Sequence, residues 1–248
     1  MKVLEVKDVS KSFYSTHALT RVNFDLEKGE VLALAGENGA GKSTMMNILL
    51  GSFAPDEGTM LLNGKTYEPK NPSDALQKGI SMIHQELCLV PSMTVADNVW
   101  IGRCNQFSRC GIYMPQLCEE RTQKLFDDYG IDLNPKESVK NLSTAQMQMV
   151  EIARAISYGS QIVIMDEPTS ALSDKEVKVL YKIIRRLTQE GVSVLFISHK
   201  LEEVFDLADR VTIFRDGHMV GLHQVKEMTM DDLIDGIAAV SYTYLTLP

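Results

Sequence analysis

The stretch that decides the fold runs Ala35-Gly36-Glu37-Asn38-Gly39-Ala40-Gly41-Lys42-Ser43-Thr44 and fits the pattern G-x-x-x-x-G-K-[ST]. A short apolar run at 31–35 reads as a buried strand before it, and 43–50 reads as the start of a helix after it. Glycines in such a loop let backbone N–H groups wrap a polyphosphate at the positive end of the helix dipole. Because a strand and a helix flank the motif, a simple glycine turn is the weaker interpretation. The loop predicts a nucleoside triphosphate site, in which Lys42 reaches the β- and γ-phosphates and the Ser43 hydroxyl holds Mg²⁺.

The composition is that of an ordinary globular protein. The chain has 248 residues, enough for one large α/β domain or a core with a smaller subdomain. A formal net charge of −8 without a strongly basic block disfavours a nucleic-acid partner. The start, Met1-Lys2-Val3-Leu4-Glu5-Val6, looks like a first strand rather than a signal peptide, and no stretch approaches about 18 uncharged apolar residues. We expect a protein that is soluble or peripheral to another component.

The four cysteines give little sign of a metal centre. They are Cys88, Cys104, Cys110 and Cys118, with no C-x-x-C spacing and no histidine among the last three. Reduced thiols are the default expectation.

Strand and helix patterns alternate along most of the chain. Residues 3–35 alternate apolar and polar side chains, Asn63-Gly64 signals a hairpin, and Ser73 is a plausible N-cap for a short helix before a buried strand at 79–83. From about 87 to 157 the pattern is helical, which indicates a helical subdomain inserted into a sheet domain. Afterwards we expect strands at 161–165, 192–197 and 210–214, helices at 174–189 and 200–208, and a hairpin turn at Asp216-Gly217. This order predicts an α/β fold with a mostly parallel sheet and helices on both faces.

Two adjacent acids end an apolar strand at 162–167. Asp166, at the carboxyl end of a strand beside a phosphate loop, is placed to position Mg²⁺ through water. Glu167 could polarise a water for attack on the γ-phosphorus. Acids at a strand exit are also common where a chain simply leaves the sheet, so the pair gains its meaning from the phosphate loop.

A further motif, Leu142-Ser143-Thr144-Ala145-Gln146, opens a predicted helix. A serine and free N–H groups at a helix N-terminus can bind an anion. The alternative is that Ser143 is a simple N-cap.

The order of these motifs resembles the ATP-binding-cassette (ABC) ATPases. The set is the phosphate loop, Gln85 after a strand, the Ser143 motif, Asp166-Glu167-Pro168-Thr169-Ser170 and Ser198-His199 after another strand. The resemblance covers roughly residues 2–236 and implies a P-loop NTPase with a RecA-like, mostly parallel sheet, an antiparallel β subdomain and the inserted helical subdomain, in a cassette of residues 1–237. Residues 83–87, 97–103 and 146–153 look like the first cassette of monosaccharide importers of the galactose/ribose/xylose type, which carry two cassettes in one polypeptide.

The resemblance implies a role for each site residue. Phe13 would stack on adenine, with Tyr14 as the nearby alternative; a core aromatic is the other interpretation of Phe13. Gln85 would contact Mg²⁺ and the attacking water, on the loop that senses the permease. His199 would contact the γ-phosphate and hold Glu167 or the water, although a histidine at a strand end is often structural. The ATP-binding set is Phe13, Gly36, Glu37, Asn38, Gly39, Ala40, Gly41, Lys42, Ser43, Thr44, Ser143 and Gln146; the catalytic set is Glu167, His199, Gln85 and Lys42; the Mg²⁺ set is Ser43, Gln85 and Asp166.

Two departures from the family pattern stand out. The family's Ser-Gly-Gly-Gln core is Ser143-Thr144-Ala145-Gln146, whose side chains could crowd the approach to the γ-phosphate of an opposed cassette. We therefore expect weakened or asymmetric use of that half-site, which Ser143 and Gln146 would complete for the partner. The family's aspartate after the acids is Ser173, with Asp174 one place later, which puts communication between the two sites in doubt.

The last residues, 238–248, match nothing that the resemblance implies, and we expect a truncated frame with a few foreign residues.

The expected protein is an ATPase of a sugar importer on the cytoplasmic face of the membrane. Its partners would be a second cassette, a membrane permease and, indirectly, an extracytoplasmic sugar-binding protein. One alternative is a soluble cassette protein that acts on nucleic acid or ribosomes, but the acidic composition and the lack of a long coiled-coil insert favour transport. A P-loop kinase is another, but it would leave Ser143 and the acid pair unexplained.

Overall fold

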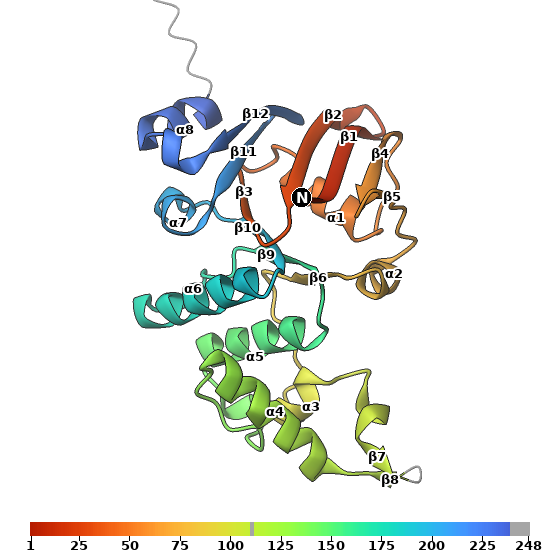
Figure 1. The fold of residues 1–248 in the computed structure, drawn as a ribbon, viewed down its shortest axis with the longest axis vertical. Helices are drawn as coiled ribbons and strands as arrows, with labels where there is room; N and C mark the ends of the chain where they lie inside the picture. The colour runs from red at the N-terminus through yellow and green to blue at the C-terminus, as the bar shows by residue number, and fades with distance from the viewer. Residues whose placement is uncertain (110–111, 239–248) are drawn as a thin grey trace, which may run out of the picture.

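The computed structural model describes residues 1–109 and 112–238. Figure 1 shows an upper part that holds the two large sheets with several helices, and a lower part that is mainly helical. Cys110 and the predicted tail beyond residue 238 lie outside the described residues. Cys88, Cys104 and Cys118 are free thiols. Among the described helices, none is long and apolar enough to cross a membrane.

The central sheet follows the predicted α/β pattern. Among the described residues it has six strands in the order β12-β11-β3-β10-β9-β6, and only the edge pair β11–β12 is antiparallel. Its strands are β3 (Val31–Ala35), β6 (Ile80–Ile83), β9 (Ile162–Asp166), β10 (Ser193–Ile197), β11 (Arg210–Arg215) and β12 (His218–Gln224). The inner strands β3 and β10 are buried along their whole length, as expected for parallel strands covered on both faces.

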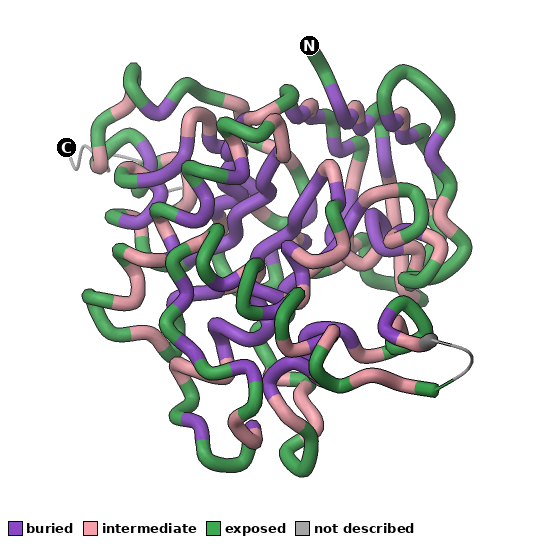
Figure 2. The backbone as a smooth tube through the Cα atoms, turned by 60° about the horizontal axis from the view of Figure 1, so that its bottom comes forward, coloured by how far each residue is buried: buried purple, intermediate pink, exposed green. Residues whose placement is uncertain are grey.

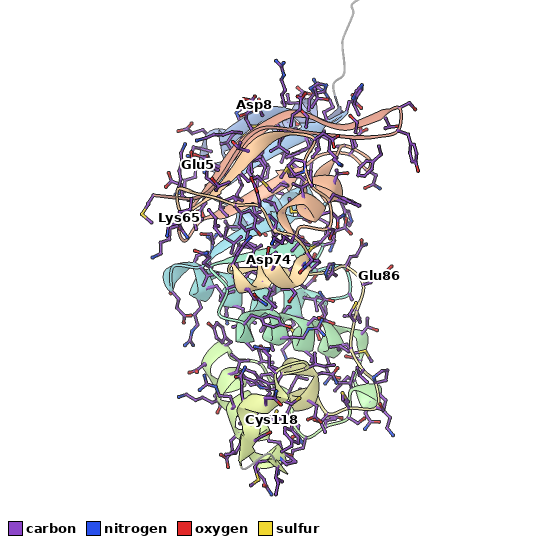
Figure 3. All side chains as sticks on the ribbon, turned by 90° about the vertical axis from the view of Figure 1, so that its right-hand side faces the viewer. Glu5, Asp8, Lys65, Asp74, Glu86 and Cys118 are labelled. Carbon is purple, nitrogen blue, oxygen red and sulfur yellow. The ribbon has the colours of Figure 1, made fainter. Side chains whose placement is uncertain are left out.

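A second sheet is antiparallel and has the order β2-β1-β4-β5 among the described residues. Its strands are β1 (Lys2–Phe13), β2 (Thr16–Glu27), β4 (Glu57–Leu62) and β5 (Lys65–Thr66). The turn between β4 and β5 is the predicted Asn63-Gly64, where both residues have positive φ, the conformation of a tight hairpin turn. Lys65 marks this edge of the molecule in Figure 3.

The side chains on the two faces of the central sheet pack into two separate hydrophobic cores. Because side chains alternate along a strand, Leu32 and Leu34 of β3 pack toward the antiparallel sheet and α1 (Lys42–Leu49), whereas Val31, Ala33 and Ala35 pack into the other core. Figure 2 shows these buried segments gathered along the middle of the molecule. The sheet is therefore fixed from both sides, and so are the loops at its strand ends.

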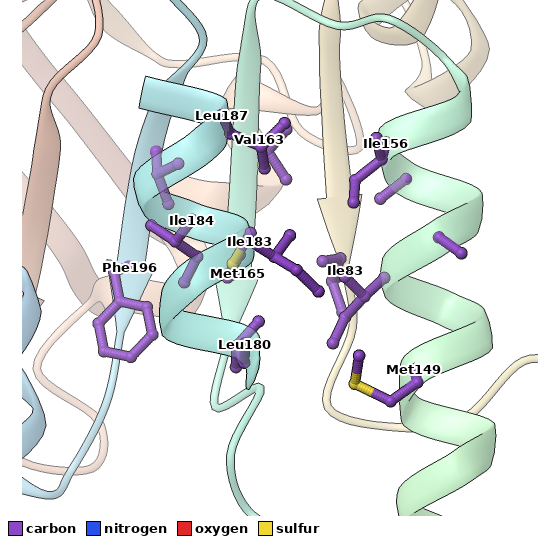
Figure 4. Packing of buried hydrophobic residues seen from close by; sticks show 14 of the residues in the cluster. Ile83, Met149, Ile156, Val163, Met165, Leu180, Ile183, Ile184, Leu187 and Phe196 are labelled. Carbon is purple, nitrogen blue, oxygen red and sulfur yellow. The ribbon is translucent and has the colours of Figure 1, made fainter. Parts of the chain in front are cut away.

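The second core joins the sheet to the remaining helices. In Figure 4, α6 (Asp174–Gln189) packs a stripe of apolar residues against β9 and β10, while Ile83 points toward Met149 and Ile156 of α5 (Thr144–Ser157). The stripe on α6 is Leu180, Ile183, Ile184 and Leu187. The other helices are α2 (Pro72–Gln77), α3 (Val95–Val99), α4 (Pro115–Tyr129), α5 (Thr144–Ser157), α6 (Asp174–Gln189), α7 (Leu201–Leu207) and α8 (Met230–Ala238).

The region predicted to be helical holds α3, α4 and α5, below the sheet in Figure 1. Cys118 of α4 lies in this lower part, as Figure 3 shows. Its predicted loop at 102–115 contains a short 3₁₀ turn at Cys104–Phe107 and two small strands, β7 (Ser108–Arg109) and β8 (Ile112–Tyr113). The exact bounds of an inserted subdomain, 87–157, stay a prediction.

Two details of the sequence interpretation need correction. The N-cap of α2 is Asn71 and not Ser73: the Asn71 side chain accepts from the Asp74 amide at 2.9 Å, and Pro72 takes the first helical position, where no N–H is needed. Helix α8 was not predicted, because Gly236 lowers helix propensity. At that position a Cβ would lie 2.6 Å from Ile213 Cδ1, the end of a side chain on β11 against which α8 lies.

Candidate functional site

A cavity of about 480 Å³ opens at the carboxyl ends of β3, β9 and β10. This is the edge of a parallel α/β sheet at which ligands usually bind, and the volume suits a small-molecule site. The lining residues are Thr16, His17, Ala18, Asn38, Gly39, Gly41, Lys42, Ser43, Thr44, Gln85, Asp166, Glu167, Ile197, Asp216 and Gly217.

The glycine loop is shaped by close backbone packing. Gly36 has a φ of +150°, and a Cβ there would lie 2.2 Å from the carbonyl oxygen of Phe214. Gly41 has a φ of +104°, and its Cβ would lie 2.7 Å from the carbonyl oxygen of Ala18. Only glycine fits at both places. Gly39 differs, because a Cβ there would meet nothing within 4 Å.

Lys42, at the first turn of α1, folds its amine back over the loop. Its Nζ donates to the carbonyl oxygens of Gly36 at 2.8 Å and Glu37 at 2.9 Å. Burial lowers the pKa of Lys42, while the negative charges of Asp166 and Glu167 oppose that shift. The amine is thus held by loop carbonyls beside the cavity, facing the acids across it.

Asp166 is the last residue of β9 and lines the cavity. Burial raises the pKa of its carboxyl, and the charge of Glu167 adds to the rise. The Asp166 carboxylate, beside Glu167 and only partly exposed, therefore favours a cation between it and the loop.

Glu167 makes two side-chain contacts within the site. Its Oε2 accepts from Gln85 Nε2 at 3.2 Å, and its Oε1 lies 3.0 Å from Nδ1 of His199. The backbone at Glu167 has a φ of +47°, a left-handed conformation that costs energy for a residue with a side chain. Three sequence-predicted residues from three strand ends therefore meet at one carboxylate.

The signature residues lie elsewhere. Ser143 caps α5, with Gln146 N donating to Ser143 Oγ at 3.2 Å and Ser143 N donating to Gln146 Oε1 at 2.9 Å. This reciprocal capping box confirms the N-cap interpretation. Within the described chain neither residue lines the cavity that contains Lys42.

The two candidate aromatic residues are also outside the cavity lining, as far as the structure describes it. Phe13 ends β1 and packs edge-on against Phe53, with ring centroids 5.1 Å apart. Tyr14 is fully exposed in the turn that follows. Phe13 is half-buried and belongs to neither hydrophobic core, and Phe53 is itself exposed, so the stacking role of Phe13 stays a prediction.

Six cavity residues were not among the predicted site residues: Thr16, His17, Ala18, Ile197, Asp216 and Gly217. Ile197 ends β10, Thr16 to Ala18 begin β2, and Asp216-Gly217 is the turn between β11 and β12. Thr20 N donates to Gly217 O at 2.8 Å and so joins β2 to this turn, and Gly217 N donates to Ala40 O at 3.2 Å and so joins the turn to the glycine loop. The dipeptide Asp216-Gly217 signals a turn, but nothing local says that this turn closes on the glycine loop.

Comparisons with known proteins agree with this geometry. A family model described as "ABC transporter" matches residues 19–170. The putative ribose/galactose/methyl galactoside import ATP-binding protein 1 of Burkholderia cenocepacia (strain HI2424) is 49% identical over 232 residues, which are 94% of this chain and 44% of that protein. The chain therefore spans less than half the length of this curated relative.

Solved structures show the same fold. A nucleotide-free ATP-binding cassette from an ABC transporter superposes with a TM-score of 0.81 at 24% identity, over 96% of each chain. A dimeric cassette in a post-hydrolysis state with ADP and Pi gives 0.77 at 23% identity, over 91% of this chain and 100% of that one. The predicted α/β cassette fold is confirmed, and the chain belongs to the ABC transporter family.

Proposed function

We propose that this chain binds and hydrolyses ATP to drive monosaccharide import through a membrane permease. The observation that carries the proposal is that Glu167 contacts both Gln85 and His199. Glu167 lines the same cavity as the glycine loop. A carboxylate held by two neighbours and facing a phosphate-binding loop suits the activation of a water. The name of the Burkholderia relative supports the sugar class.

The residues present fit a magnesium nucleotide. Gly36 and Gly41 admit no Cβ without clashing with backbone, so the loop keeps the open form that a polyphosphate needs. Ser43, Gln85 and Asp166 are the groups that would hold Mg²⁺, and all three line the cavity. A cation there would offset the burial and the charge of Glu167 that raise the pKa of Asp166. When bound, Mg²⁺ neutralises charge on the β- and γ-phosphates.

Each catalytic group has one task in this proposal. Glu167 accepts a proton from, or orients, the attacking water; Gln85 positions that water; His199 holds Glu167 and contacts the γ-phosphate. Lys42, released from the carbonyls of Gly36 and Glu37, places its charge on the β- and γ-phosphates. Backbone amides of Asn38 to Thr44 supply the remaining donors.

A second cassette would complete the site. Ser143 and Gln146 sit at the start of α5 and away from this chain's own cavity, so their role in binding ATP needs an opposed copy. The dimeric solved cassette supports a head-to-tail pair. Phe13, at the end of β1 and close in sequence to the cavity residues Thr16 to Ala18, would then stack on adenine.

The proposed location is the cytoplasmic face of the membrane, with a permease as direct partner and an extracytoplasmic sugar-binding protein as indirect partner. The test is affinity purification of the tagged chain from detergent-solubilised membranes, followed by measurement of sugar-stimulated ATP turnover in vesicles. We expect a permease to co-purify and turnover to rise with sugar. Co-purification with ribosomes or DNA, and turnover that ignores sugar, would favour the soluble cassette alternative instead.

A further inference from the structure

Glu203 is a buried acid that the proposed chemistry does not use. It lies in the first turn of α7 and is 7% exposed. Within the described chain it does not line the cavity, so it touches neither the nucleotide nor the water. A buried carboxylate is costly unless it is hydrogen-bonded or paired, and this one has three partners.

One oxygen of Glu203 joins the two turns that carry Glu167 and His199. Its Oε2 accepts from Thr169 Oγ1 at 2.9 Å and from Ser198 Oγ at 2.7 Å. Both hydroxyl residues are themselves buried, at 2% and 4% exposure. The other oxygen, Oε1, lies 3.2 Å from Lys200 Nζ.

The positions of these hydroxyls in the sequence matter. Thr169 comes two residues after Glu167, and Ser198 comes directly before His199. Backbone bonds continue the link, because Glu167 N donates to Ile197 O at 2.9 Å and Lys200 N donates to Ser198 Oγ at 3.1 Å. Oε2 of Glu203 therefore holds Thr169 and Ser198 together, and the neighbouring residues Glu167 and His199 contact each other at the cavity.

We propose that Glu203 is a positioning residue, which sets the separation between Glu167 and His199 through Thr169 and Ser198. This inference rests on the proposed function for its kinetic consequence, but not for its structural one. Among the described residues, Glu203 is the hydrogen-bond partner of the Thr169 hydroxyl, so its removal would let the strained backbone at Glu167 relax. A shift of about 1 Å in a catalytic group can cost on the order of 100-fold in rate.

The kinetic test compares Glu203→Ala with Glu203→Gln in the assembled transporter. Glutamine keeps a carbonyl oxygen that can accept from both hydroxyls, so it should retain most of the turnover. Alanine should lower kcat about 10- to 100-fold with KM for ATP changed less than about twofold. The matched control is Glu202→Ala, an exposed acid in the same turn, which should turn over like the wild type. Equal losses for alanine and glutamine, or a rise in KM instead of a fall in kcat, would overturn the proposal.

A second measurement does not need activity. Amide hydrogen exchange on the whole chain should show faster exchange in Glu203→Ala confined to residues 166–170 and 197–200, with β3 and α1 unchanged. Exchange that rises throughout both cores would mean a merely structural role, and unchanged exchange in those two turns would refute the link. If the wild type proves inactive, the proposed function fails, and the exchange comparison still decides the role of Glu203.

Discussion

Two connections reach the same cavity and are held in place by different means. The glycine loop at 36–44 is shaped by its own backbone, which passes so close to Phe214 and Ala18 that side chains are excluded. The connection after β6, which carries Gln85, is held from outside by side chains of α3 and α5. Figure 3 shows Glu86 on this connection, at the side of the molecule between the sheet and the helical part.

Side chains of α5 and α3 bond to the backbone of the connection after β6 at two places. Glu151 of α5 accepts from the amide of Cys88 at 2.8 Å and pairs with Arg154, which donates to the Cys88 carbonyl at 3.0 Å. Further along, Asn98 of α3 accepts from Val90 N at 2.7 Å and donates to Val90 O at 3.1 Å. The comparison indicates that the backbone packing of the glycine loop sets its shape, whereas helices α3 and α5 position the connection that follows Gln85.

Gly36→Ala should have the largest effect, because it forces the glycine loop away from β11. A Cβ placed 2.2 Å from Phe214 O cannot be accommodated without moving backbone. We expect a loss of about 3 kcal/mol in the free energy of unfolding, together with loss of ATP binding. Denaturant unfolding and titration with a fluorescent ATP analogue check both. Gly39→Ala is the control: its Cβ meets open space, so only the left-handed strain of about 1 kcal/mol applies. Equal losses in the two variants would show that loop packing is not what matters.

Glu151→Ala should affect the other connection and leave the first intact. Removing this carboxylate, which is 5% exposed, leaves the Cys88 amide and the Arg154 guanidinium without their partner. We expect about 2 kcal/mol of lost stability, faster amide exchange at Cys88, and a Kd for ATP within about twofold of the wild type. Glu120→Ala, at an exposed position of α4, should change stability by less than about 0.5 kcal/mol. If Glu151→Ala weakens ATP binding as severely as Gly36→Ala, the two connections are not independent.

Asp166→Asn should have the smallest effect on folding, and in the opposite direction. The pKa of Asp166 is raised by burial and by Glu167, so its ionised form costs the folded protein stability above that pKa, while below the pKa of the unfolded chain the cost is absent. Asparagine removes the ionisation, so we expect a gain of less than about 1 kcal/mol at pH 7 that vanishes as the pH falls to about 4. Unfolding curves across this pH range measure it. The exposed control Asp132→Asn should show no such pH-dependent gain.

Most of the fold and half of the site could be predicted because their signals are local. Strand periodicity gave β1, β2 and the central strands, and the glycine pattern with the strand-end acids placed Lys42, Asp166 and Glu167 around one cavity. Gln85 and His199 came from the family resemblance, and the structure brings both to Glu167.

What the sequence could not supply depends on contacts distant along the chain. Glu203 reads as an ordinary acid in a helix, and its partners Thr169 and Ser198 are found only once β9 and β10 lie side by side. The cavity turn at Asp216 and the clamp of Glu151 on Cys88 are of the same kind. Helix α8 was not predicted because Gly236 is locally unfavourable in a helix, and its contact with Ile213 of β11 is distant along the chain.

The central claim is that Glu167, held by Gln85 and His199, activates the attacking water, and Glu167→Gln tests it most directly. The variant keeps the shape of the side chain and removes its ability to accept a proton. The measurement is ATP turnover and ATP affinity in the assembled transporter, beside the exposed control Glu202→Gln. We predict retained ATP binding with turnover reduced about 100-fold or more. Turnover within about twofold of the wild type would contradict the role assigned to Glu167.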